Sequence, residues 1–271
     1  MRLIEGELVV VRGAGDLATG CILRLVRAGF RVAALETSRP SAIRRSVCLS
    51  EAVYEGFAEV EGVRALRVDS AEQLLANLEA CVPILVDPGC SVLAQLRPVA
   101  LVDAIIAKRN LGTRIDLAPL VVALGPGFEA GVDAHAVIET NRGHDLGRVL
   151  LRGSAEPNTG VPGLVQGFGR ERVLHAPCAG RVENLHRIGD RVQAGEPVLA
   201  LVGAQGRTTL AAAIDGTLRG LIRPGFQAEA GLKLADLDPR CRREHCFTVS
   251  DKANAIAGGV LEAILRLGTR P

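Results

Sequence analysis

The chain has 271 residues, of which 48% are hydrophobic and 23% are charged, and its formal net charge is +2 at pH 7. These values are typical of a globular protein with one large or two ordinary domains, and the small net charge argues against nucleic acid as a partner. The seven cysteines are scattered and predict no disulfide framework. No apolar run reaches the length of a membrane span, so we expect a cytoplasmic protein without a membrane partner.

The first half of the chain alternates short apolar runs with segments of helical periodicity. Leu8–Val11 is expected to be a buried strand, Asp16–Ala28 an amphipathic helix and Arg31–Leu35 a second strand. Further strands are expected at 63–68, 83–86, 99–102 and 120–124, and helices after Ser70 and over 91–96. Short strands at 135–140 and 148–151 follow, and antiparallel pairing is left open for them. The alternation predicts a doubly wound, mostly parallel sheet.

A glycine-rich turn joins the first expected strand to the first expected helix. Its residues are Gly13, Ala14, Gly15, Asp16, Leu17 and Ala18, which fit the pattern G-x-G-x-x-[G/A] of Rossmann-like nucleotide sites. There, amide groups at the start of the helix hold a diphosphate. Glu36 ends the second strand, where a carboxylate would accept hydrogen bonds from a ribose diol. An ordinary tight turn without a ligand is the alternative.

Three side chains are candidates for catalysis near such a site. Asp87 and Asp103 follow expected strands, so each would lie at the carboxyl edge of the sheet, where ligands bind. Either could instead cap a following helix, and capping is favoured for Asp103. His144, in a polar run that begins at Glu139, is the candidate general acid or base, with a solvated surface loop as the alternative. Lys108 is expected to complement the end of a short helix.

Two segments of the second half repeat each other at an offset of 36 residues. The first runs from Leu174 to Leu201 and the second from Leu210 to Leu237, with three pairs of glycines in one register. A short, glycine-punctuated repeat of this kind predicts two interlocked halves of a small β domain. Cys241, His245 and Cys246 lie just beyond it without a second pair of ligands nearby, so no metal site is expected.

The repeat resembles the biotinyl/lipoyl hammerhead, or barrel-sandwich hybrid, domains. The resemblance is carried by the segments 176–180 and 188–198 and covers about a quarter of the chain. In the carrier domains, the modified lysine sits on the hairpin that joins the two halves. The corresponding hairpin, 202–209, contains Arg207 but no lysine, and a guanidinium cannot be acylated in its place. We therefore expect the domain to dock, orient or cover a ligand.

The chain as a whole resembles the selenium-dependent molybdenum hydroxylase system proteins of the YqeB type. The segments that carry this resemblance are 12–20, 102–104, 108–110, 124–128, 139–144, 250–253 and 258–263. The N-terminal part is also similar in kind to the Rossmann domain of XdhC-type factors that mature xanthine dehydrogenase. The resemblance implies an accessory or maturation protein that binds a nucleotide and acts on a client molybdenum hydroxylase.

The expected organisation is therefore a Rossmann-like nucleotide-binding domain at 1–155, a small all-β hammerhead-like domain at 170–240, and a C-terminal helix at 250–268 that packs on the first domain. The cofactor would be NAD(P) or a molybdopterin dinucleotide. Two other functions stay open, an NAD(P)-dependent oxidoreductase and a non-catalytic nucleotide-binding adaptor. Whether the protein is an enzyme or a homo-oligomer is also left open.

Overall fold

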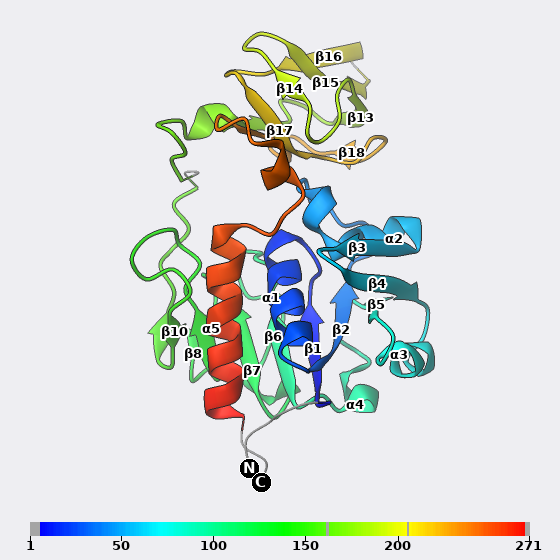
Figure 1. Cartoon of the computed structure of the whole chain (residues 1–271), viewed down its shortest axis with the longest axis vertical. Coiled ribbons are helices and arrows are strands. Elements are labelled where there is room, and N and C mark those ends of the chain that lie inside the picture. Colours follow the sequence, from blue (N-terminus) through cyan, green and yellow to red (C-terminus); the bar gives the residue numbers. More distant parts are fainter. Residues whose placement is uncertain (1–5, 161–162, 205, 269–271) are drawn as a thin grey trace. The chain divides into compact units, whose positions relative to one another are not determined.

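A computed structural model describes residues 6–160, 163–204 and 206–268. The chain divides into two compact units: the first consists of residues 1–40, 48–159 and 249–271, and the second of residues 41–47 and 160–248 (Figure 1). Within the described residues the protein is mixed α/β, with a nine-stranded, mostly parallel sheet, smaller antiparallel sheets and a long C-terminal helix.

The large sheet has the strand order β10-β9-β7-β6-β1-β2-β5-β4-β3. Its strands are β1 (Leu8–Arg12), β2 (Arg31–Glu36), β3 (Phe57–Val60), β4 (Val63–Val68), β5 (Val82–Val86), β6 (Ala100–Asp103), β7 (Val121–Leu124), β9 (Ala136–Ile138) and β10 (Val149–Leu150). All neighbours pair in parallel except β3 and β10, which close the two edges antiparallel. After β5 the chain crosses over β2 and β1 to form β6. The point at which the strand order reverses therefore lies between β1 and β6, where open α/β sheets bind ligands.

Helices cover both faces of this sheet. On one face, α1 (Asp16–Arg27) packs against α5 (Asp251–Leu267), which also contacts β7, β9 and β10 (Figure 1). On the other face, α3 (Ala71–Asn77) and α4 (Leu93–Leu96) share an apolar core with alternate residues of the strands. The unit also contains α2 (Ala52–Glu55), 3-10 helices at Leu49–Glu51 and Ile115–Leu117, and the two-stranded sheet of β8 (Glu129–Ala130) and β11 (Gly153–Ser154).

Serine side chains cap two helices of this unit. The Ser70 side chain accepts a hydrogen bond from the Gln73 amide, and the Ser250 side chain accepts one from the Ala253 amide. The segment 104–114 differs from the prediction, since no helix follows β6. Pairing of β9 with β7 is parallel, whereas β10 runs antiparallel to β9.

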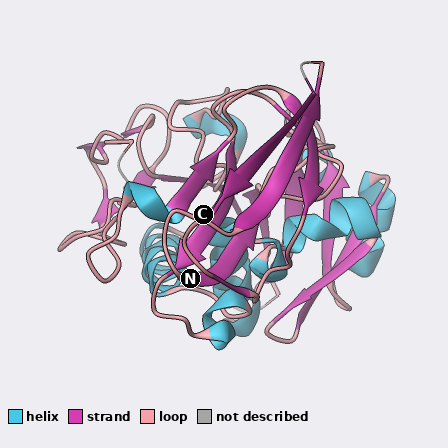
Figure 2. Cartoon of the chain, turned by 90° about the horizontal axis from the view of Figure 1, so that it is seen from above, coloured by secondary structure: helices cyan, strands magenta, loops and turns pink. Residues whose placement is uncertain are grey.

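The second unit contains two four-stranded sheets among its described residues, ordered β12-β19-β17-β14 and β16-β15-β13-β18. Figure 2 shows the strands of the chain in magenta. Their strands are β12 (Val173–His175), β13 (Gly180–Asn184), β14 (Arg191–Val192), β15 (Pro197–Gly203), β16 (Gly206–Ala211), β17 (Gly216–Leu221), β18 (Gln227–Ala228) and β19 (Lys233–Asp238). β13 and β14 start 36 residues before β17 and β18. Each sheet combines two strands from each repeat, so the two halves interlock.

Segment 41–47 belongs to the second unit, although it precedes most of the first unit in sequence. The Leu221 amide donates to the Ile43 carbonyl at 2.8 Å, and Arg45 Nε donates to the Leu221 carbonyl at 2.8 Å. Arg44 donates to the carbonyls of His245 and Thr248. The expected domain at 1–155 included these residues, whereas in the structure segment 41–47 groups with the second unit.

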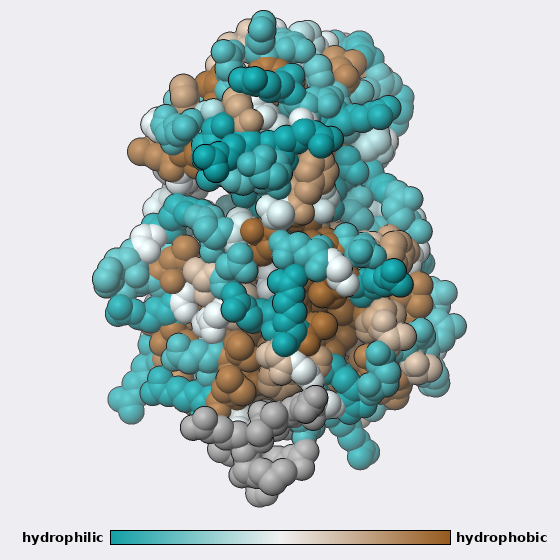
Figure 3. Space-filling model, viewed as in Figure 1, coloured by the Kyte–Doolittle hydropathy of each residue, from teal (hydrophilic) through white to brown (hydrophobic). Residues whose placement is uncertain are grey.

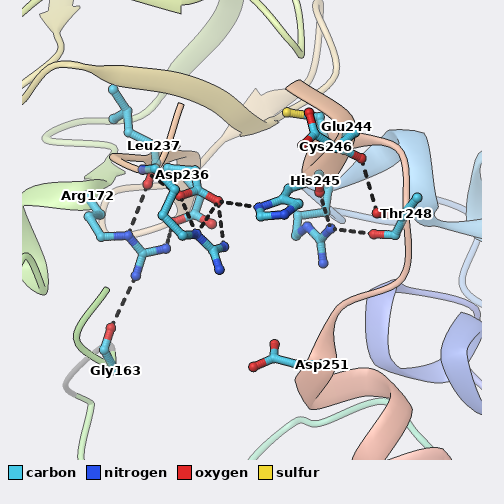
Figure 4. Close-up of polar contacts among 12 residues, drawn as sticks. Gly163, Arg172, Asp236, Leu237, Glu244, His245, Cys246, Thr248 and Asp251 are labelled. Carbon is cyan, nitrogen blue, oxygen red and sulfur yellow. Dashed lines mark hydrogen bonds and ion pairs between the residues drawn. The ribbon is translucent and has the colours of Figure 1, made fainter. Parts of the chain in front are cut away.

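The interior of the second unit contains charged side chains that form ion pairs and hydrogen bonds with one another and with the backbone. Arg172 pairs with Asp236 at 3.0 Å and donates to the carbonyls of Leu237 and Gly163 (Figure 4). Asp238 is completely buried and receives hydrogen bonds from Arg240, which help to hold the pKa of its carboxyl below the usual range in spite of burial. Buried charges of this kind are tolerated only when partners replace their lost hydration.

In the described ranges, no helix is both long and apolar enough to cross a membrane. On the face drawn in Figure 3, hydrophobic residues are interspersed with hydrophilic ones. All seven cysteines are free thiols.

Candidate functional site

The glycine-rich turn lies at the carboxyl end of β1, beside the carboxyl end of β6. Gly13 has a φ of 99°, and a Cβ at this position would lie 3.3 Å from the backbone of Ala104. Helix α1 starts at Asp16, and no side chain caps it at Gly15. A Cβ on Gly15 would meet no atom within 4 Å. The start of α1 therefore has open space beside Gly15, where an anion could approach main-chain amides.

Glu36 lies next to this turn, but both of its carboxylate oxygens are already in use. Oε2 accepts a hydrogen bond from the Ala14 amide at 2.8 Å, and Oε1 accepts one from the Thr37 amide at 2.7 Å. The side chain is 7% exposed, and burial raises the pKa of its carboxyl in spite of these two bonds. In this structure, the carboxylate predicted to receive a ribose diol holds the glycine-rich turn instead.

Asp103 is a buried ion-pair partner and caps no helix. Its Oδ2 accepts hydrogen bonds from Arg12 Nη1, at 3.1 Å, and from the Thr113 hydroxyl. Arg12 also donates to the carbonyls of Pro88 and Leu111. The predicted capping role of Asp103 is wrong, as is the helix-end role of Lys108, because the chain loops back after β6 to bring Thr113 to this pair. Arg12 was missed as a candidate; its only signal was a charge at the end of an apolar strand.

Asp87 stabilises the turn that leads into α4. Its Oδ1 accepts a hydrogen bond from the Ser91 hydroxyl, and its Oδ2 accepts one from the Val92 amide, each at 3.0 Å. Asp87 therefore stabilises the turn before α4 and does not cap that helix, whose N-cap residue is Val92 and which has no side-chain cap. Cys90, in the same turn, is buried, and burial raises the pKa of its thiol to about 11. Cys90 is therefore a protonated thiol near neutral pH.

The polar run that begins at Glu139 is divided between the interior and the surface. Glu139 is buried and accepts hydrogen bonds from the amides of Asn141 and Glu156, at 2.7 Å and 2.8 Å. Arg142 forms a two-pronged ion pair with Asp251. His144, the candidate acid or base, is exposed. Spacing alone gave no indication that Glu139 would turn inward while His144 would remain on the surface.

Lys252 joins this edge of the sheet from the first turn of α5. Its charged neighbours are Arg142, Asp16, Glu139 and Asp251, and burial is the main cause that lowers the pKa of its ammonium group. Lys252 lies here because α5 packs closely against α1. The next residue of α5 is Ala253, and a Cβ on Gly20 of α1 would lie only 2.8 Å from the Ala253 Cβ. The sequence did not mark Lys252 as a site residue, because its proximity to Asp16 depends on how α1 and α5 pack.

Strained backbone gathers near the same edge. Cys90, Ile106 and Lys108 have φ values of 59°, 55° and 63°. Left-handed backbone is costly for residues other than glycine, most of all for a β-branched residue such as Ile106. Such conformations concentrate at functional sites and persist only where surrounding contacts enforce them.

In the described ranges, no group of three or more His, Cys, Asp or Glu side chains is arranged to hold a metal ion. Cys246 donates its thiol proton to the Leu218 carbonyl, and His245 Nδ1 lies 3.8 Å from Asp238 Oδ2. Gln205, in the hairpin that would carry the lysine of a carrier domain, lies outside the described residues.

These features define a mixed α/β protein whose strand order reverses beside an uncapped helix start. The chain is a homologue of the Escherichia coli (strain K12) "Uncharacterized protein YqeB", with 49% identity over 262 residues. The match covers 96% of the chain and 48% of that protein, so the chain spans about half the length of the curated relative that it matches. No model of a protein family matches the chain.

Solved structures give only distant likenesses. A succinylglutamate desuccinylase/aspartoacylase from Rhodobacter sphaeroides has 15% identity and a TM-score of 0.29, over 86% of this chain and 85% of that one. The product-bound ectoine utilization protein EutE (DoeB) from Ruegeria pomeroyi has 11% identity and a TM-score of 0.28, over 88% of this chain and 86% of that one. TM-scores this low carry no conclusion about fold or activity.

Proposed function

We propose that the chain is a nucleotide-binding accessory protein of a selenium-dependent molybdenum hydroxylase system. In this proposal, a nucleotide or a molybdopterin-type dinucleotide binds at the carboxyl edge of a Rossmann-like sheet. Its diphosphate lies against the amides of the β1–α1 turn, Gly13–Ala18. The client is a molybdenum hydroxylase whose cofactor the protein helps to install or modify. The link to that system rests on the sequence resemblance described above.

The single observation that carries the nucleotide site is the open, uncapped start of α1 at the point where the strand order reverses. No side chain caps α1 at Gly15, and Gly15 has no neighbour within 4 Å of where a Cβ would lie. The N-terminal amides of a helix attract anions because they are unpaired and lie at the positive end of the helix dipole. Backbone strain at Ile106 and Lys108, on the loop that follows β6, adds support.

The same geometry favours binding over hydride-transfer chemistry. Asp103 is fully buried and neutralised by Arg12, and both oxygens of Asp87 hold its own turn. His144 lies on the surface. A general base in a protected site needs a side chain that is shielded from solvent and is not held by structural hydrogen bonds or an ion pair. None of the three candidate catalytic side chains meets both conditions. An adaptor without catalytic activity remains compatible with the proposal.

We propose a barrel-sandwich hybrid identity for the second unit and a role in docking the client or its cofactor. The interlocked sheets and the 36-residue offset between their strands support this identity. The absence of lysine from 202–209 argues against a swinging arm, since no amine is available to carry a covalent group.

A thermal-shift screen against NAD, NADP, CTP, GTP and molybdopterin dinucleotides tests the proposed function. A ligand that binds only the folded state raises the Tm, and the stabilisation grows with the logarithm of its concentration once that concentration exceeds its Kd. Stabilisation by a cytidine or guanosine species supports the maturation role, whereas stabilisation by NAD(H) alone supports an oxidoreductase. If no nucleotide shifts the Tm, the proposed site is wrong.

Gly15→Val should abolish that shift while leaving the fold intact. Gly15 has a φ of −70°, which any residue adopts, and its side chain would enter the open space where the diphosphate is expected. We expect at least a tenfold loss of nucleotide affinity, about 1.4 kcal/mol, in isothermal titration calorimetry. Gly258→Ala on α5 is the control, because its Cβ also meets no neighbour. Unchanged affinity in Gly15→Val would refute the placement of the diphosphate.

A further inference from the structure

We propose that Glu36 is an internal latch that occupies the glycine-rich turn until a ligand displaces it. This inference rests on the proposed nucleotide site and concerns how that site is regulated. Its basis is the hydrogen bond from the Ala14 amide to Glu36 Oε2, at 2.8 Å, within the G-x-G segment itself.

The latch matches the chemistry of the expected ligand. A carboxylate oxygen and a phosphate oxygen are both anionic acceptors, and both form charge-assisted hydrogen bonds with main-chain amides. Ala14 lies between the two glycines of the turn and is completely buried. Its single N–H group cannot donate fully to Glu36 and to a ligand oxygen at once. A diphosphate that uses this amide must therefore compete with Glu36.

The latch is held firmly but can be released. Glu36 Oε1 also accepts a hydrogen bond from the Thr37 amide, so the turn and the end of β2 are joined through one side chain. Thr37, Ser38 and Arg39, which follow directly, are exposed. Release therefore requires reorientation of a side chain at a strand end beside solvent. A displaced Glu36 would then be free to accept hydrogen bonds from the ribose of the same ligand.

Inorganic pyrophosphate separates the latch from a simple ribose-binding role, because it has no ribose. We expect Glu36→Gln and Glu36→Ala to bind pyrophosphate about tenfold more tightly than the unmodified chain, measured by calorimetry at constant ionic strength. Glu79→Gln is the matched control, since the Glu79 side chain is 82% exposed and lies away from the turn. Circular dichroism establishes that each variant is folded.

A second measurement uses the unmodified chain. Lowering the pH protonates Glu36 and weakens the latch. The pyrophosphate affinity of the unmodified chain should therefore rise relative to the affinity of Glu36→Gln at the same pH. The ratio of the two affinities removes the effect of protonation of pyrophosphate itself.

The outcomes separate the latch from the site on which it rests. Equal or weaker pyrophosphate binding by the Glu36 variants, with nucleotide binding by the unmodified chain, would overturn the latch and leave the nucleotide site standing. If neither nucleotides nor pyrophosphate bind any of the folded proteins, both proposals fail. Pyrophosphate binding only by the variants would support the latch in its strongest form.

Discussion

At the scale of single residues, the carboxylates of the sheet edge bond groups of the protein itself: Glu36 bonds main-chain amides, and Asp103 pairs with Arg12. The sequence placed Glu36 and Asp103 correctly at strand ends, and these ends meet at one edge. It could not show that Glu36 would bond the Ala14 amide or that Asp103 would pair with Arg12. Such partners depend on how loops far apart in sequence return to the edge, and periodicity contains no information on that.

Burial of Glu36 has a measurable effect on stability as a function of pH. Its pKa in the folded protein is raised above the ordinary value of 4.5, so the folded state binds its proton more tightly than the unfolded state does. The stabilisation due to this proton is complete below pH 4.5 and is lost as the pH rises through the raised pKa. We therefore expect the free energy of unfolding of the unmodified chain to fall relative to that of Glu36→Gln over this window. Urea titrations of both proteins would detect it, and a parallel pH dependence of the two would contradict the assignment.

At the scale of elements, long and regular segments were predictable and short or irregular ones were not. β4 and α5 match the predicted ranges, because alternation and capping define their ends. The edge strand β3 was missed, and two of its four residues are exposed, which weakens any apolar pattern. β8 and β11 have two residues each, too few for a period to emerge.

The contact between α1 and α5 depends on a residue without a side chain. Gly20→Val would bring a branched side chain against the Ala253 Cβ and carbonyl, since even a Cβ at this position would lie 2.8 Å and 3.1 Å from them. We expect a loss of about 1–3 kcal/mol in the free energy of unfolding, as for other overpacked cores. Denaturant unfolding measures this loss. Gly258→Ala, which has space in the same helix pair, should instead stabilise the protein by roughly 0.5–1 kcal/mol.

At the scale of the whole molecule, the division into units does not follow the sequence. Residues 41–47 leave the first unit, join the second and return. The sequence could not indicate this, because these seven residues have no periodic pattern and their partners, β17 and 243–248, lie far along the chain. The 36-residue repeat, in contrast, was visible directly and corresponds strand by strand to the two sheets of the second unit.

Ile43→Ala tests whether segment 41–47 supports the second unit. Ile43 is partly buried against the core of that unit and lies over Gly220. We expect a loss of about 1–3 kcal/mol in the free energy of unfolding, less than the roughly 2–5 kcal/mol typical of a fully buried isoleucine on average. Hydrogen exchange should localise it to amides of β17 and β19, whereas the central strands of the large sheet keep their protection. Leu75→Ala, at an exposed position of α3, is the control and should have little effect in either unit.

The exchange of strands within the second unit joins its two halves. Neither half of the repeat contains a complete sheet, since each half supplies two strands to one sheet and two to the other. A single half would therefore lack two of the four strands of each sheet. Two intertwined copies of one half would form the same two sheets, so this unit has the architecture of a dimer within a single polypeptide.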